Sequence, residues 1–242
     1  MHTLLILMPC LLCSTATAMD FVRFIDTGTG VAQRDPLGGV DPADGSLIYD
    51  NATFPSQGGR TLLVSFPRFG SDQIGDDIIL SSQTPGFLTD GLYAFRNMST
   101  SRSLTSFTVV HRWYNDTRQL LAERTSSLSL GGGLPPLAAA QIESQGNLLL
   151  PYNIPVHGSV HWSLQFSDIQ GIFLSDLAFV VAGPHTLGSS TSLIHNYTTG
   201  TDIDLGANGD ANLMFKLSST TPTPSTISLG LLSTFIACRR RR

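Results

Sequence analysis

The feature that most constrains the fold is an alternation of apolar and polar residues in short segments. In "SVHWSLQF" (159–166) the apolar residues occupy every second position, with polar residues between them. A period of two also runs through much of "LTSFTVVHRWYN" (104–115) and "DANLMFKL" (210–217). Successive side chains of a β-strand point to opposite faces, so this pattern indicates strands that bury one face.

The alternation also predicts which side chains face the core. His161 and Gln165 fall on the outward face, and His111 falls on an inward one, where it would be a satisfied core histidine. The expected inward residues are Val160, Trp162, Leu164, Phe166, Phe107, Val109, His111, Trp113, Leu213, Phe215 and Leu217.

Between Asp20 and Leu217 the chain offers about a dozen such segments, separated by Gly, Pro, Asn or Asp. Charged residues make up only 13% of the chain, so the residues that favour long exposed helices are scarce. Only residues 134–145, "LPPLAAAQIESQ", read as helical. We therefore expect an all-β domain over residues 19–217, in the form of a single antiparallel, jelly-roll-like β-sandwich.

The first 18 residues have the pattern of a secretory signal peptide. An apolar stretch from Leu4 to Cys13 leads into small residues, and Ala16 and Ala18 form an A-x-A cleavage pattern. We expect the export machinery to be a partner of the chain and the mature protein to be secreted. The three cysteines lie in the terminal apolar runs, so thiol catalysis by the body is excluded.

The C-terminus combines three elements in a fixed order. Residues 218–226 form a Ser/Thr/Pro linker, residues 227–238 are mostly apolar, and four arginines follow. Twelve residues make a helix of about 18 Å, shorter than the roughly 30 Å hydrocarbon core of a bilayer. We expect a transient membrane contact, with the arginines on the cytoplasmic side. The residues concerned are Pro222, Thr223, Pro224, Arg239, Arg240, Arg241 and Arg242.

This terminal arrangement resembles the PEP-CTERM sorting signal of bacterial exosortase substrates, with Thr223 where that family usually has glutamate. The resemblance implies processing by an exosortase-like enzyme at the cell envelope. The order of "IYDN" (48–51), "GDDIIL" (75–80), "FTVVHRWYND" (107–116) and "LLAE" (120–123) also resembles a group of uncharacterised exosortase-sorted surface proteins. That resemblance implies one β-sandwich ectodomain and a surface location, but no activity.

Charge argues against nucleic acid as a partner. Four of the fourteen basic residues are the terminal arginines, so in the rest of the chain 10 basic residues face 18 acidic ones, a net charge of −8. An acidic body repels the phosphates of nucleic acids. It is compatible with cation binding and with solubility.

The best metal candidate is "TDIDLGANGDAN" (201–212), where calcium would take oxygen ligands from alternating loop positions. The alternative is an Asx-rich turn between two strands. We expect no other cofactor. The possible calcium ligands are Asp202, Asp204, Asn208 and Asp210.

No catalytic motif occurs in the body, so we expect no enzyme activity. The leading hypothesis is an exported, C-terminally sorted protein with a structural or adhesive role at the cell surface or in the extracellular matrix. One alternative is a carbohydrate-binding module that contacts extracellular polysaccharide; the other is a secreted hydrolase on a jelly-roll scaffold. The aromatic residues available for stacking on sugars are Tyr93, Tyr114, Tyr152 and Tyr197.

Overall fold

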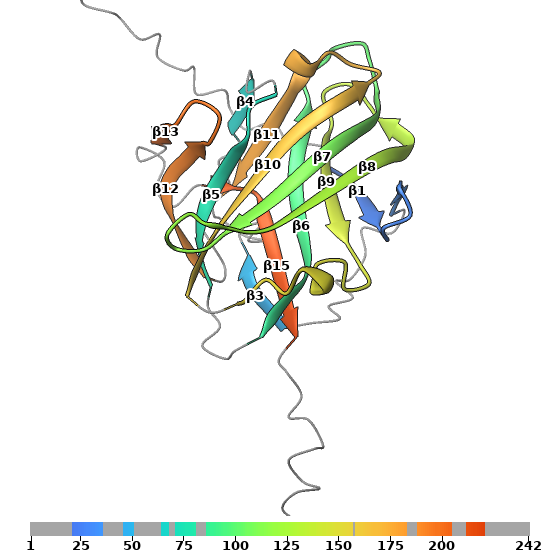
Figure 1. Cartoon of the computed structure of the whole chain (residues 1–242). Helices are drawn as coiled ribbons and strands as arrows, with labels where there is room; N and C mark the ends of the chain where they lie inside the picture. The colour runs from blue at the N-terminus through green and yellow to red at the C-terminus, as the bar shows by residue number, and fades with distance from the viewer. Residues whose placement is uncertain are drawn as a thin grey trace, which may run out of the picture.

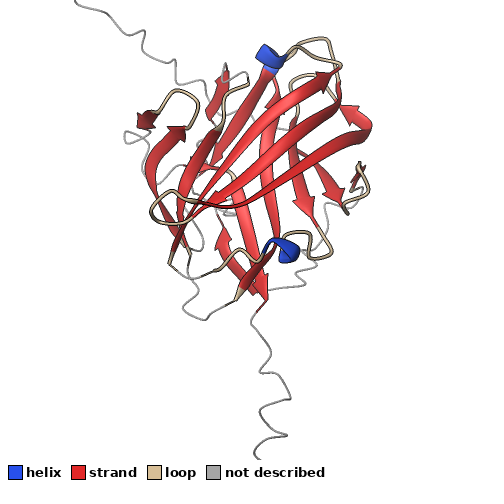
Figure 2. Ribbon diagram, in the orientation of Figure 1, coloured by secondary structure: helices blue, strands red, loops and turns tan. Residues whose placement is uncertain are grey.

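The protein is described by a computed structural model that covers residues 21–35, 46–50, 64–67, 71–80, 86–156, 158–182, 188–204 and 212–220. These residues form β-strands and two short 3₁₀ helices (Figure 2). The all-β prediction is therefore confirmed.

The first nine strands lie between residues 21 and 144. They are β1 (Phe21–Asp26), β2 (Val31–Arg34), β3 (Ser46–Asp50), β4 (Val64–Pro67), β5 (Ile74–Ile79), β6 (Phe87–Asn97), β7 (Leu104–Tyr114), β8 (Leu120–Leu134) and β9 (Ala139–Ser144). The elements that follow are η1 (Leu150–Tyr152), β10 (Ser159–Gln170), η2 (Leu174–Asp176), β11 (Leu177–Ala182), β12 (Ser189–Asn196), β13 (Thr201–Asp204), β14 (Asn212–Leu213) and β15 (Phe215–Thr220).

The strands belong to one continuous sheet, in the order β13-β12-β5-β10-β7-β8-β2-β1-β9-β6-β11-β14. Strand β15 pairs with β6 and β3, and β4 pairs with β11. Most neighbours are antiparallel, as expected, but β1 runs parallel to β9 and β2 runs parallel to β8. The prediction of a wholly antiparallel arrangement is wrong at these two pairs, because the chain returns to β8 and β9 after long excursions instead of by hairpins.

The sheet bends so that its two halves face each other. Figure 1 shows β5, β10, β7 and β8 crossing in front of β6, β9 and β15. Trp162 on β10 stacks on Phe215 of β15, with ring centroids 3.7 Å apart. Phe166 on β10 meets Phe95 of β6 edge-on at 5.4 Å. The layers remain joined by hydrogen-bonded strands, so a jelly-roll-like sandwich with two separate sheets stays a prediction.

The prediction of which side chains face the core is confirmed. Every residue expected to point inward is buried, and His111 lies in this core between aromatic rings. The outward face of β10 differs from the expectation at one point, because Ser163 is also fully buried. Side chains from neighbouring strands cover it, so this part of the sheet is covered on both sides.

Residues 134–145 are not helical, which corrects the one helical expectation. Residues 139–144 form β9, which pairs with β1 on one side and β6 on the other. Ala140, Ile142 and Ser144 are buried while Gln141 and Glu143 are less so, which is the period of a strand. Pairing on both edges overrides the helix propensity of the three alanines.

The terminal segments lie outside the described residues. This applies to the expected signal peptide with Ala16 and Ala18, to residues 221–226 of the linker, and to the expected sorting segment at 227–242. No helix among the described residues has the length and hydropathy needed to cross a bilayer.

Candidate functional site

A band of interlocked polar side chains covers the outward side of β5, β7 and β10. We call it the polar outer face; it consists of Gln73, Arg112, Tyr114, Gln165 and Tyr197. Alternation along β7 turns Arg112 and Tyr114 outward, since His111 and Trp113 point inward. Register places Ser163 of β10 opposite Arg112, so residues distant in sequence meet on this face.

Arg112 and Gln73 organise the polar outer face. The Arg112 guanidinium donates hydrogen bonds to Gln73 Oε1 at 3.1 Å, to Gln165 Oε1 at 2.9 Å and to Glu123 Oε2 at 2.7 Å. The Gln73 amide in turn donates to the Tyr114 hydroxyl at 2.6 Å and to Ser163 Oγ at 2.7 Å. The side chains are thus held in place by one another.

Two tyrosine rings lie beside this network. Tyr114 on β7 and Tyr197, just after β12, stack with centroids 5.1 Å apart and planes 8° apart. Both residues are half-buried. Burial raises the pKa of Tyr197 above its ordinary value, so its hydroxyl stays protonated. The pair offers an apolar surface flanked by amide and guanidinium groups.

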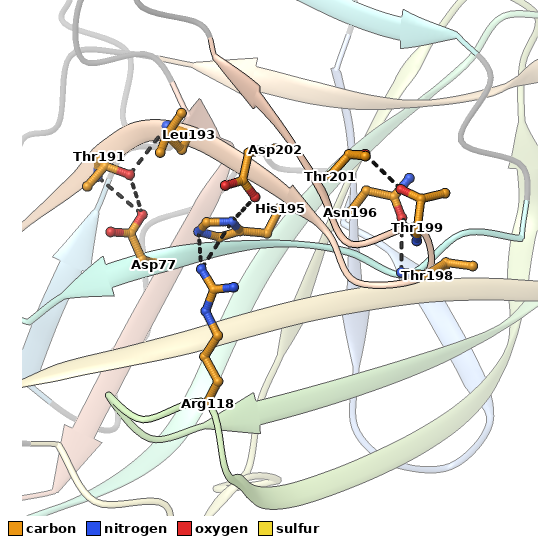
Figure 3. A network of polar contacts seen from close by, with 10 residues as sticks. All are labelled: Asp77, Arg118, Thr191, Leu193, His195, Asn196, Thr198, Thr199, Thr201 and Asp202. Atoms are coloured by element: carbon orange, nitrogen blue, oxygen red, sulfur yellow. Dashed lines mark hydrogen bonds and ion pairs between the residues drawn. The ribbon is translucent and has the colours of Figure 1, made fainter.

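A second group of residues, the His195 cluster, adjoins the tyrosines; it consists of Arg118, His161, His195 and Asp202. Figure 3 shows Arg118, His195 and Asp202. His195 on β12 and Asp202 on β13 are direct cross-strand partners. His195 Nδ1 donates to Asp202 Oδ1 at 2.5 Å, and this bond lowers the pKa of Asp202. The ionised carboxylate therefore orients the imidazole.

Arg118 reaches the cluster from the turn between β7 and β8. Its Nη2 lies 3.4 Å from both ring nitrogens of His195. The backbone of Arg118 has φ of 60°, a conformation that favours glycine. Asn115 holds the turn, because its Oδ1 accepts hydrogen bonds from the backbone N–H groups of Thr117 and Gln119. The turn thus places the positively charged guanidinium of Arg118 beside the imidazole of His195.

His161 on β10 is the remaining member of the His195 cluster. Its ring lies 6.1 Å from that of His195, at an interplanar angle of 60°. Burial lowers the pKa of His161, and the charges of Arg118 and His195 lower it further, against the opposite effects of Asp77 and Asp116. Its Nδ1 is buried without a partner among the described residues. The sequence placed His161 on the surface, whereas the structure makes it part of this cluster.

A contact between two strands and an ordered turn flank the cluster in Figure 3. Asp77 Oδ1 accepts a 2.7 Å hydrogen bond from Thr191 Oγ1, which ties β5 to β12. At the β12–β13 turn, Asn196 Oδ1 accepts bonds from the backbone N–H groups of Thr198 and Thr199. The edge of the sheet is therefore stabilised by side chains as well as by strand pairing.

The predicted calcium ligands are only partly described. Asp202 is in the His195 cluster, and Asp204 is exposed at the end of β13. Asn208 and Asp210 lie outside the described residues, as do Pro222, Thr223, Pro224 and the four terminal arginines. No group of three metal-ligating side chains occurs in the part of the chain that the structure describes. Calcium binding stays a prediction from sequence.

The four tyrosines expected as sugar contacts separate into three environments. Tyr114 and Tyr197 come together on the polar outer face, Tyr152 is exposed in η1, and Tyr93 is buried in the core. Tyr93 is therefore excluded as a surface contact. Sequence analysis missed His195, although a hairpin across "NYTTG" (196–200) would have paired His195 with Asp202.

The Asn-x-Ser/Thr triplets in the described residues serve as turns. In each, the asparagine Oδ1 accepts the N–H two residues later, at Asn97, Asn115 and Asn196. Asn97 is fully buried, and its amide donates to the carbonyl oxygens of Arg102, Leu134 and Pro135. The triplets thus have a structural role in the fold.

Comparison with protein-family models and with curated proteins gave no match for this chain.

Proposed function

We propose that the chain is an exported β-protein of the cell surface or extracellular matrix, with an adhesive role exerted through contact with polysaccharide. The terminal segments support export: an A-x-A pattern at the start, and a proline-bearing linker, an apolar run and four arginines at the end. The export machinery and an exosortase-like processing enzyme would act on these segments before the body reaches its destination.

The polar outer face is the observation that supports an adhesive role. Sugars present hydroxyl groups in the ring plane and C–H groups above it, so their binding sites combine planar hydrogen-bonding side chains with aromatic rings. Gln73, Arg112 and Gln165 supply amide and guanidinium groups, and Tyr114 and Tyr197 supply rings. Because these side chains already hold one another, little conformational entropy is lost on binding.

The geometry favours contact with a chain lying across the sheet. The residues of the polar outer face lie on β7 and β10, just before β5 and just after β12, so the face extends across several strands and is not confined to one loop. A surface of this kind suits an extended polymer better than a small isolated ligand. A domain that binds such a polymer would attach the protein to an extracellular matrix.

Affinity electrophoresis in gels that contain a soluble neutral polysaccharide tests the proposal. The native chain is expected to be retarded, and Tyr197→Ala to bind about fivefold more weakly, since an aromatic contact contributes about 1 kcal/mol. The matched control is Thr108→Ala, at the other end of the outward face of β7, where the Thr108 hydroxyl forms a hydrogen bond with Ser127. Equal retardation of the native chain and Tyr197→Ala would refute the assigned face.

A second experiment addresses export and sorting. Cells that naturally make the protein are fractionated, and the C-terminus of the mature chain is read by mass spectrometry. The proposal expects a chain outside the cytoplasm that stops near Pro224. A mature cytoplasmic chain that still carries Arg239–Arg242 would contradict it.

A further inference from the structure

The interior of the fold contains a small polar cavity between the two facing halves of the sheet. It has room for about one water-sized molecule. Its lining comes from β1, β6, β7, β8, β9 and β15. The polar side chains on its wall are those of Asp26, Tyr93, His111, Trp113, Arg124 and Ser144.

Three of these residues each have a buried polar atom without a hydrogen-bond partner among the described residues. These atoms are the Tyr93 hydroxyl, His111 Nε2 and the Trp113 indole N–H. Their rings adjoin one another: Tyr93 meets His111 edge-on at 4.9 Å, and His111 stacks with Trp113 at 5.6 Å. A buried polar group without a hydrogen-bond partner destabilises a fold. Three such groups around one cavity therefore indicate a bound molecule that forms hydrogen bonds with all of them.

The charges around the cavity select a neutral guest. Asp26 and Arg124 form an ion pair at 2.7 Å, and the other Asp26 oxygen accepts the Gly28 N–H. Burial lowers the pKa of His111 to about 3, and burial raises the pKa of Tyr93 above its ordinary value. Both side chains are therefore uncharged at neutral pH. Asp26 and Arg124 already neutralise each other, so neither a cation nor an anion would find an unpaired counter-charge in this pair.

We propose that this cavity binds one buried water molecule, which accepts the Trp113 indole hydrogen and exchanges hydrogen bonds with Tyr93 and His111. Water suits the three groups because it offers two donors and two acceptors. Trp113 can only donate, while a phenol hydroxyl and a neutral imidazole can complete the remaining bonds. The water would join β6 to β7 inside the fold, on the opposite side of β7 from Tyr114.

The two buried tryptophans provide a matched test. The indole N–H groups of Trp113 and Trp162 are both buried and both lack a partner among the described residues. Only Trp113 contributes to the cavity wall. Magnetisation transfer from water to the indole hydrogens is measured by NMR on the ¹⁵N-labelled protein, and Trp113→Phe assigns the two signals.

The proposal expects a direct cross-peak between long-lived water and the Trp113 indole hydrogen, with none at Trp162. Tyr93→Phe, which keeps the ring but removes one partner of the water, should weaken the Trp113 cross-peak. Absence of the cross-peak at Trp113 in the native protein, or equal cross-peaks at both tryptophans, would overturn the proposal. The decisive comparison is made in the native chain, so it does not depend on the folding of a variant.

A double-mutant cycle gives an independent measurement. Tyr93→Phe, His111→Phe and the double variant are unfolded in urea at neutral pH. If both side chains bind the same water, the double variant loses less stability than the sum of the single losses. Additive losses would show that the two groups do not share a partner, against the proposal.

Discussion

Asp26 on β1 accepts a 2.7 Å hydrogen bond from Arg124 on β8, and this buried ion pair joins strands that β2 separates in the order of the sheet. The Asp26 side chain is 3% exposed. The same carboxylate accepts the Gly28 N–H and so also shapes the turn between β1 and β2. One side chain thus connects a local turn with the interior.

Loss of the Asp26 charge should be strongly destabilising. We expect Asp26→Asn to lower the free energy of unfolding by about 3–5 kcal/mol, because the largely buried side chain of Arg124 would lose its counter-charge. Urea unfolding measures the change. Glu123→Gln, which removes an exposed partner of Arg112, is the control and should cost less than about 1 kcal/mol. Similar losses in both variants would contradict the importance of burial.

His111 should make the fold sensitive to acid. Its pKa is about 3 in the fold, through burial and then the charge of Arg124, against an ordinary value of 6.5. The unfolded chain therefore takes up the proton first, and stability falls as the pH drops from about 6.5 towards 3. At about pH 4.5 the contribution is roughly 3 kcal/mol.

The test compares urea unfolding at about pH 7.5 and about pH 4.5 in the native chain and in His111→Phe. The variant is expected to lose less stability between the two pH values, whatever its stability at neutral pH. An equal loss in both proteins would assign the acid sensitivity to other groups.

The hydrogen bond from His195 should be visible in the titration of Asp202. In the native chain the Asp202 carboxyl is expected to titrate below its ordinary pKa, because the His195 hydrogen bond stabilises its charged form. His195→Phe keeps a ring in place and should return the Asp202 pKa towards the ordinary value. Carbon-13 NMR of the Asp202 carboxyl group measures this pKa. In the control variant His161→Phe, the pKa of Asp202 should remain below its ordinary value.

Asn97 should contribute more to stability than the other turn asparagines. Its amide donates to carbonyl oxygens at the end of β8 and in the β6–β7 and β8–β9 connections; the bond to Leu134 is buried and the other two are partly buried. Asn97→Ala is expected to cost about 3 kcal/mol or more, since it leaves buried carbonyl groups without a donor. Asn115→Ala, in an exposed turn, should cost about 1 kcal/mol in the same thermal unfolding experiment.

The strands themselves could be predicted because their signal is local. Trp162 and Phe166 are buried because successive side chains of a strand point to opposite faces. A strand that buries one face therefore has an apolar residue at every second position, and this pattern can be read from the sequence. The alternation in β9 was concealed by three successive alanines, which favour a helix in isolation. Only the pairing of β9 with β1 and β6 decided its conformation.

The candidate site was less predictable, because its members come from different strands. His195 and Asp202 meet across one hairpin, so a register argument could have found them. His161 lies on β10, and it comes close to His195 on β12 because a single strand, β5, separates these two strands in the sheet. Gly75 allows the close approach of β5 to β10, since a Cβ atom there would lie 2.2 Å from the Trp162 carbonyl oxygen.

By itself, the sequence determined that the body is built from strands and which side chains form the core; export and sorting stay predictions from the patterns at its two ends. The tertiary structure decided the parallel pairs, the polar outer face, the His195 cluster and the buried cavity. The physical reason is the range of the interactions. Alternation acts between neighbours in the chain, whereas Asp26 and Arg124 are 98 positions apart and meet only when the sheet bends over its own core.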